Sequence, residues 1–130
     1  MLFIVNSVLL LLLLAWLLMI VVGLTIKGVV IPVPFTDLSA TKKRPVLVVS
    51  NDTYNSSHPD MIVAAITLNL LQPGLSLTNS DMVTGQLPKP SLIRTDKIYT
   101  LSQLIVVKGI GQINNATLED AKAEIIGYIS

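Results

Sequence analysis

The architecture of this chain is set by the stretch Pro45-Val46-Leu47-Val48-Val49-Ser50. It is short, rich in β-branched residues and apolar at consecutive positions, as expected for a strand covered on both faces. A second run of this kind, Met61-Ile62-Val63-Ala64-Ala65-Ile66-Thr67, follows the polar segment 51–60, whose composition predicts a loop. The two runs predict central, buried strands of one β-sheet.

Further strands are expected on either side of this pair. Val29–Phe35 is typical of a strand, but Pro32 and Pro34 remove backbone donors and therefore predict an edge or bulged strand. Three more candidate strands follow later in the sequence: residues 75–78, 91–100 and 104–113, the last interrupted by glycines.

The end of the chain has a different pattern. Thr117-Leu118-Glu119-Asp120 resembles a capping box, and apolar residues then recur at helical spacing as far as Ile129. The sequence thus predicts a β-rich α+β fold, a small SH3-like barrel with a C-terminal helix packed on it, over residues 27–130.

Residues 1–26 form a leader of another kind, with 22 apolar residues of 26 and no charge. As a helix it would extend about 37 Å, enough to cross a bilayer core. Basic residues follow it at Lys27 and 42–44, so the positive-inside rule places 27–130 in the cytoplasm, tethered as a single-pass membrane protein. The near-absence of a linker favours the alternative that translation starts at Met19 and that the leader is a mis-called start.

Composition excludes several kinds of site. The 130 residues include no cysteine and a single histidine, His58, which excludes disulfide scaffolds, thiolate zinc sites, cysteine nucleophiles and pairs of imidazoles. Nine basic and eight acidic residues give a net charge of +1. A polyanion would therefore have to bind to a local patch rather than to the overall field.

Such a patch is offered by Lys42-Lys43-Arg44, immediately before the first buried strand. A guanidinium at a strand end can bind phosphate oxygens in a planar, bidentate manner, although a solvated turn explains the same residues. Thr67 ends the second buried run, where a β-branched residue is ordinary. If the two runs are antiparallel neighbours, Arg44 and Thr67 share one rim of the sheet.

The collinear pattern of residues 27–130 resembles the MazF/PemK family of toxins. The segments that carry the resemblance are Lys27–Val30, Pro34–Ser39, Lys42–Asp52, Asn55, Ile62–Thr67, Leu87–Ser91, Asp96–Ile98, Thr100-Leu101 and Gly111. The leader has no counterpart in it. The resemblance implies a barrel of the MazF/PemK type.

It also implies a function: a sequence-selective, metal-independent endoribonuclease (an mRNA interferase) that cleaves single-stranded RNA by attack of the 2′-hydroxyl. Arg44 would stabilise the charge on phosphorus and could protonate the leaving oxygen, and Thr67 would bind a phosphate oxygen. Phe35, Lys43 and Ser91 would line the RNA groove. No metal or cofactor is implied. The implied partners are a second copy in a homodimer and an antitoxin, with DNA bound only through the toxin–antitoxin complex.

Two departures from the family pattern keep an alternative open. Residues 38–43 contain no carboxylate, and Ser39 stands where a glutamate is expected. Leu68 stands where a small polar residue is frequent. The alternative is a catalytically weak or inactive module of the same fold that binds nucleic acid or a protein partner.

Overall fold

The computed structural model describes residues 26–36, 41–106 and 108–130, without the side chains of Phe35, Thr36 and Thr41. The predicted leader therefore lies outside the described residues, apart from Ile26. Within these ranges, no helix combines the length and apolar character that a bilayer span requires.

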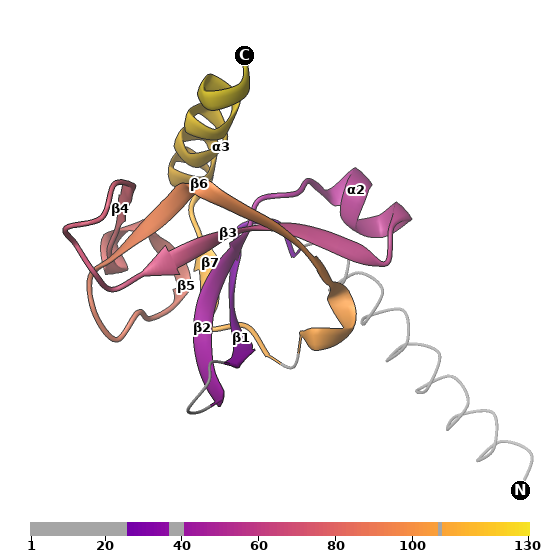
Figure 1. Ribbon diagram of the computed structural model, residues 1–130, viewed down its shortest axis with the longest axis horizontal. Coiled ribbons are helices and arrows are strands. Elements are labelled where there is room, and N and C mark those ends of the chain that lie inside the picture. Colours follow the sequence, from indigo (N-terminus) through magenta and orange to yellow (C-terminus); the bar gives the residue numbers. More distant parts are fainter. Residues whose placement is uncertain (1–25, 37–40, 107) are drawn as a thin grey trace, which may run out of the picture.

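Seven antiparallel strands build one curved sheet, a half-barrel, in the order β4-β6-β3-β2-β1-β7-β5 (Figure 1). The C-terminal helix α3 stands at one end of it. The predicted β-rich α+β class with a C-terminal helix is confirmed. The elements are β1 (Val29–Thr36), β2 (Thr41–Val48), α2 (Asp52–Ser57), β3 (Asp60–Thr67), β4 (Leu75–Leu77), β5 (Met82–Gly85), β6 (Ser91–Ser102), β7 (Gly111–Ile113) and α3 (Asn115–Ile129), with 3-10 turns at Asn79–Asp81 and Gln103–Ile105.

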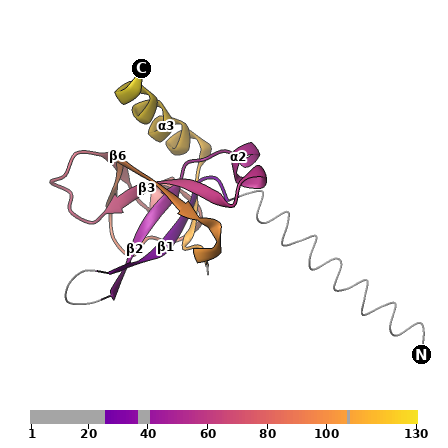
Figure 2. The ribbon, with the colours of Figure 1, turned by 45° about the vertical axis from the view of Figure 1, so that its right-hand side comes forward.

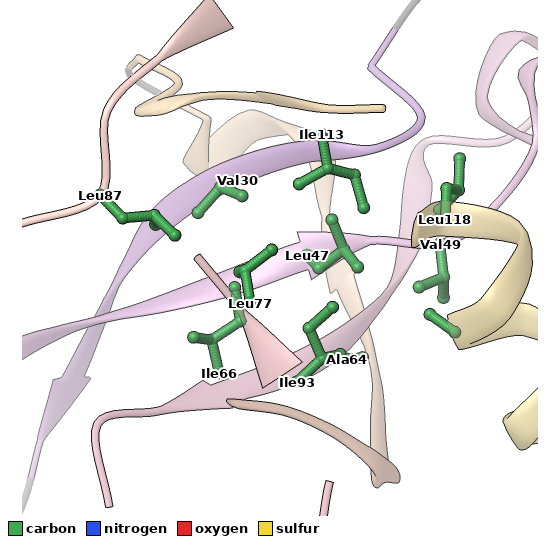
Figure 3. Packing of buried hydrophobic residues seen from close by; sticks show 11 residues of the cluster. Val30, Leu47, Val49, Ala64, Ile66, Leu77, Leu87, Ile93, Ile113 and Leu118 are labelled. Atoms are coloured by element: carbon green, nitrogen blue, oxygen red, sulfur yellow. The ribbon is translucent and has the colours of Figure 1, made fainter. Parts of the chain in front are cut away.

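The two buried runs form β2 and β3, which lie beside each other in the middle of the sheet. Side chains of β2 alternate between two apolar clusters, because successive residues of a strand point to opposite faces. Leu47 belongs to the cluster shown in Figure 3, which Leu118 of α3 also joins, whereas Val46 and Val48 belong to the cluster on the other face. The prediction of a central strand covered on both sides is confirmed.

The prolines of β1 lie where that strand has a single neighbour among the described strands. Only Val29 and Val30 pair with β7, whereas the pairing with β2 continues from Val30 to Thr36 and sets Pro32 opposite Pro45. The outer halves of β1 and β2 thus form a two-stranded ribbon that points away from α3 (Figures 1 and 2). The prediction of an edge strand from Pro32 and Pro34 is therefore confirmed for the part of β1 beyond Val30.

Two local predictions are wrong. Residues 51–60 are not all loop: Asn51 caps helix α2, its side chain accepting a hydrogen bond from the Tyr54 amide (2.8 Å). Residues 104–113 are not one strand, because the 3-10 turn comes first and only Gly111–Ile113 pair, as β7. Gly111 packs so closely against the Thr84 carbonyl of β5 that no side chain fits between them.

The start of the C-terminal helix also differs from its prediction. The capping residue is Asn114 rather than Thr117, and its side chain accepts a hydrogen bond from the Thr117 amide (2.7 Å). Thr117 lies inside the helix, and its hydroxyl donates to Asp81 (2.9 Å). Asparagine and threonine both favour the N-cap position of a helix. Composition alone therefore does not show which of Asn114 and Thr117 caps the helix.

Candidate active site

The pairing of β2 with β3 brings Arg44 and Thr67 together. The two strands are antiparallel, with Val46 opposite Ala65 and Leu47 opposite Ala64. Continued by two residues, this register sets Arg44 opposite Thr67. Both residues line one cleft, of about 760 Å³, so the juxtaposition expected from the sequence is present.

Thr67 is held in a defined orientation. Its hydroxyl oxygen accepts a hydrogen bond from the backbone amide of Asn69 (3.1 Å). A hydroxyl has one donor and two acceptor positions, so this bond leaves the O–H proton available to a ligand oxygen. On the neighbouring strand β2, Arg44 is solvent-exposed and presents a planar guanidinium. The pair therefore presents a cation and a hydroxyl donor to one ligand.

A large irregularity in β6 shapes the opposite wall. Ala64 of β3 pairs with Ile98, but the next residue, Ala65, pairs with Arg94. The three residues 95–97 thus have no partner on β3, and β6 bends at this point (Figure 1). Bulges re-aim side chains and often lie beside functional sites. Here Arg94, which precedes the extra residues, and Lys97, the last of them, both line the cleft.

Arg94 is held in place by three side-chain hydrogen bonds. Its Nε and Nη2 donate to the two carboxylate oxygens of Asp96, each at 3.0 Å, and its Nη1 donates to Oε1 of Gln72 at 2.7 Å. The Arg94 side chain is 11% exposed and that of Asp96 is 44% exposed. The hydrogen bonds from Arg94 hold the pKa of Asp96 below its ordinary value, and the same bonds raise the pKa of Arg94. These bonds use three of the five guanidinium N–H groups and leave two for a ligand.

The charges lining the cleft are of one sign. Lys43, Arg44, Arg94 and Lys97 contribute cations, and among the described residues that line it there is neither a carboxylate nor an imidazole. Such a wall attracts an anion and stabilises negative charge that develops on it. The described lining thus lacks the carboxylate and imidazole groups that most often act as general bases.

The remaining predicted site residues are placed as follows. Lys43 lines the cleft beside Arg44. Phe35 pairs with Lys42 in the outer ribbon, and its side chain lies outside the described part. Ser91 is not among the cleft residues: it begins β6, is 3% exposed, and donates its hydroxyl to the Lys89 carbonyl (3.0 Å). The structure therefore brings together Lys43, Arg44 and Thr67, and leaves Ser91 apart.

The sequence pattern does not single out Arg94. It predicts a regular strand for residues 91–100, and a regular strand gives no reason to distinguish one arginine. The one signal available is the spacing Arg94-Thr95-Asp96, in which a cation and a carboxylate two apart fall on the same face of a strand.

Comparison with protein families gives one match. The model of the PemK-like, MazF-like toxin of type II toxin–antitoxin systems matches residues 27–128, which is most of the chain. No curated protein matches the chain.

Several solved structures share the fold. One is an endoribonuclease in complex with its cognate antitoxin from a mycobacterial species, with 24% identity, a TM-score of 0.57 and coverage of 81% of this chain and 95% of that one. The Mycobacterium tuberculosis toxin MazF-mt6 is 26% identical, with a TM-score of 0.54 and coverage of 75% and 93%. A MazE–MazF structure from Deinococcus radiodurans has a TM-score of 0.63 at 16% identity, with coverage of 79% and 93%.

Proposed function

Since this chain belongs to the family of PemK-like, MazF-like toxins of type II toxin–antitoxin systems, we propose that it is a sequence-selective endoribonuclease that cleaves single-stranded RNA without a metal. The observation that carries the proposal is the meeting of Arg44 with Thr67 in a cleft whose charged lining residues are all cations. A phosphodiester is the ligand that this combination suits, because guanidinium and hydroxyl donors both bind its non-bridging oxygens.

The proposed reaction needs no group beyond the RNA, the protein and solvent water. The 2′-oxygen forms a bond to the adjacent phosphorus and the bond from phosphorus to the 5′-oxygen breaks. The 2′-hydroxyl proton passes to solvent water, and the leaving 5′-oxygen takes a proton from Arg44, which water then reprotonates. The products are a 2′,3′-cyclic phosphate and a 5′-hydroxyl. Arg44 stabilises the extra negative charge on the pentacoordinate phosphorus and supplies a proton to the leaving oxygen, and Thr67 donates to a phosphate oxygen. Arg94, fixed by Asp96 and Gln72, adds a second guanidinium from the opposite wall of the cleft.

The test uses the full-length chain, kept in a non-ionic detergent because of its uncharged first 26 residues. Wild-type protein should cut single-stranded RNA in EDTA at defined sites and leave ends that carry cyclic phosphate. Arg44→Ala should abolish the cleavage, and Arg44→Lys should restore little of it because an ammonium lacks the planar fork. Lys108→Ala, which changes a cation outside the cleft, is the matched control. RNA left intact by folded wild-type protein would contradict the proposal.

Two partners are part of the proposal. The solved relatives include complexes with an antitoxin and with MazE, and a cationic cleft is suited to an acidic, extended segment of such a protein. We expect a cognate antitoxin to occupy the cleft and to block RNA, a homodimer to be the active form, and DNA to be bound only through the toxin–antitoxin complex. Cleavage that a saturating antitoxin leaves unchanged would contradict the shared site.

A second function is favoured by one observation: the described lining of the cleft includes no carboxylate or imidazole to act as a base. In that case the chain is a binding module of the same fold. It would bind RNA with an affinity that falls steeply with salt, and would release no product. Product analysis of the same samples distinguishes the two functions.

A further inference from the structure

The described lining of the cleft includes a single aromatic side chain, that of Tyr99 on β6. Beyond the bulge, β6 pairs regularly with β3 from Ile98 to Ser102, so alternate residues face the same side. Tyr99 and Leu101 accordingly both line the cleft, about 7 Å apart along the strand, and Lys97, the last residue of the bulge, lines it beside them. The Tyr99 ring therefore lies between the cation of Lys97 and the apolar side chain of Leu101 along β6.

The ring of Tyr99 is available to a ligand. The residue is 50% exposed, although it lies in the sheet's longest strand. Among the described residues the only stacked pair of rings is Tyr54 with His58, and Tyr54 lines a separate cavity on the side of α2 and α3. Tyr99 therefore offers a flat apolar surface within a wall that otherwise attracts anions.

We propose that Tyr99 is the platform on which one base of the bound RNA stacks. The proposal rests on the proposed function, because it takes single-stranded RNA as the occupant of the cleft. In it, the cations hold the phosphates and the ring holds a base, the combination by which proteins bind single strands. Tyr99 touches no reacting atom and is a binding residue. Purines are favoured at the stacked position because two fused rings overlap more of the tyrosine.

The first experiment measures the affinity of the full-length chain for a short single-stranded RNA whose 2′-hydroxyls are all methylated, so that attack is blocked. Tyr99→Ala should weaken binding about tenfold or more, the scale of one lost base–aromatic stack. Tyr99→Phe should bind within about twofold of wild type. Tyr54→Ala, the matched control, should bind as wild type does.

The second experiment removes bases instead of the ring. Single abasic positions are moved through the same oligonucleotide, and each is measured with wild type and with Tyr99→Ala. At the stacked position the loss of the base should weaken binding to wild type and leave binding to Tyr99→Ala unchanged, because the two changes remove the same contact. With cleavable RNA, Tyr99→Ala should raise KM and leave kcat near the wild-type value.

The outcomes separate the two proposals. Additive effects at every abasic position, or a Tyr99→Ala variant that binds as tightly as wild type, would overturn the stacking while the ribonuclease stands. A wild-type chain that binds no RNA would overturn both. A Tyr99→Phe variant as weak as Tyr99→Ala would show that the hydroxyl matters instead of the ring face, and would also overturn the stacking.

Discussion

The guanidinium of Arg94 donates to both carboxylate oxygens of Asp96, two residues further along the same strand. Both residues lie at the irregularity of β6, whose extra residues have no partner on β3. Arg94 lines the cleft, whereas Asp96 is not among the cleft residues and forms an ion pair with Arg94. A fixed guanidinium loses little freedom on binding an anion, which is the property that a phosphate site requires.

The first prediction concerns Asp96→Asn. Asparagine has one acceptor oxygen and a donor NH2 where the carboxylate has two acceptor oxygens, so it cannot accept from both Nε and Nη2 in the same way. Arg94 should therefore lose its orientation while keeping its charge. We expect kcat/KM for RNA cleavage to fall by about 10- to 100-fold, the size of effect that follows loss of a charge-assisted contact. Asp120→Asn, on the exposed face of α3, is the control and should cleave as wild type does. Equal rates for the two variants would count against a role for the Arg94–Asp96 pair.

The second prediction concerns acid stability. Because the native pKa of Asp96 is lowered by the bonds from Arg94, the unfolded chain binds this proton more readily than the folded one. The stabilisation from this group is complete above its ordinary pKa of about 3.9 and is lost as the pH falls through that value towards the lower native pKa. The Tm difference between wild type and Asp96→Asn should therefore shrink below about pH 4. A difference that stays constant down to pH 3 would contradict the assignment.

The third prediction compares two glycines. A Cβ on Gly111 would collide with backbone atoms of Thr84 and Gly85, whereas one on Gly127 would have no heavy atom within 4 Å. Gly111→Ala should separate β5 from β7 and destabilise the fold by about 1–3 kcal/mol, as overpacking does. Gly127→Ala, in helix α3, should stabilise it by up to about 1 kcal/mol. Chemical denaturation of both variants measures the two signs, and a neutral Gly111→Ala would refute the tight contact.

The fourth prediction concerns residues 1–26. If they span a membrane, the natural protein should sediment with membranes and a chain that begins at Lys27 should not. The intact mass of the natural protein is the control. A mass that corresponds to a start at Met19 would identify the leader as a mis-called start.

Much of the fold could be predicted from the sequence because its signals are local. Consecutive apolar residues in β2 and β3 indicated burial on both faces, and their antiparallel pairing was enough to bring Arg44 to Thr67. The position of Arg94 could not be predicted in this way. The bulge of β6 depends on how that strand fits against β3, and nothing within residues 91–102 marks where the register shifts. Helix α2 is not predicted because its capping residue Asn51 and its short polar sequence, DTYNSS, are also typical of loops.

The prolines of β1 have a consequence for how molecules of this protein meet. Val30 offers its carbonyl to the Ile110 amide on the outer side of β1, and backbone groups alternate sides along a strand, so Pro32 and Pro34 face that same open side. An incoming strand would find two missing amide donors there and could not complete a ladder. Among the described strands none covers this half of β1 on that side, and the two prolines keep that edge from templating a further strand of another copy.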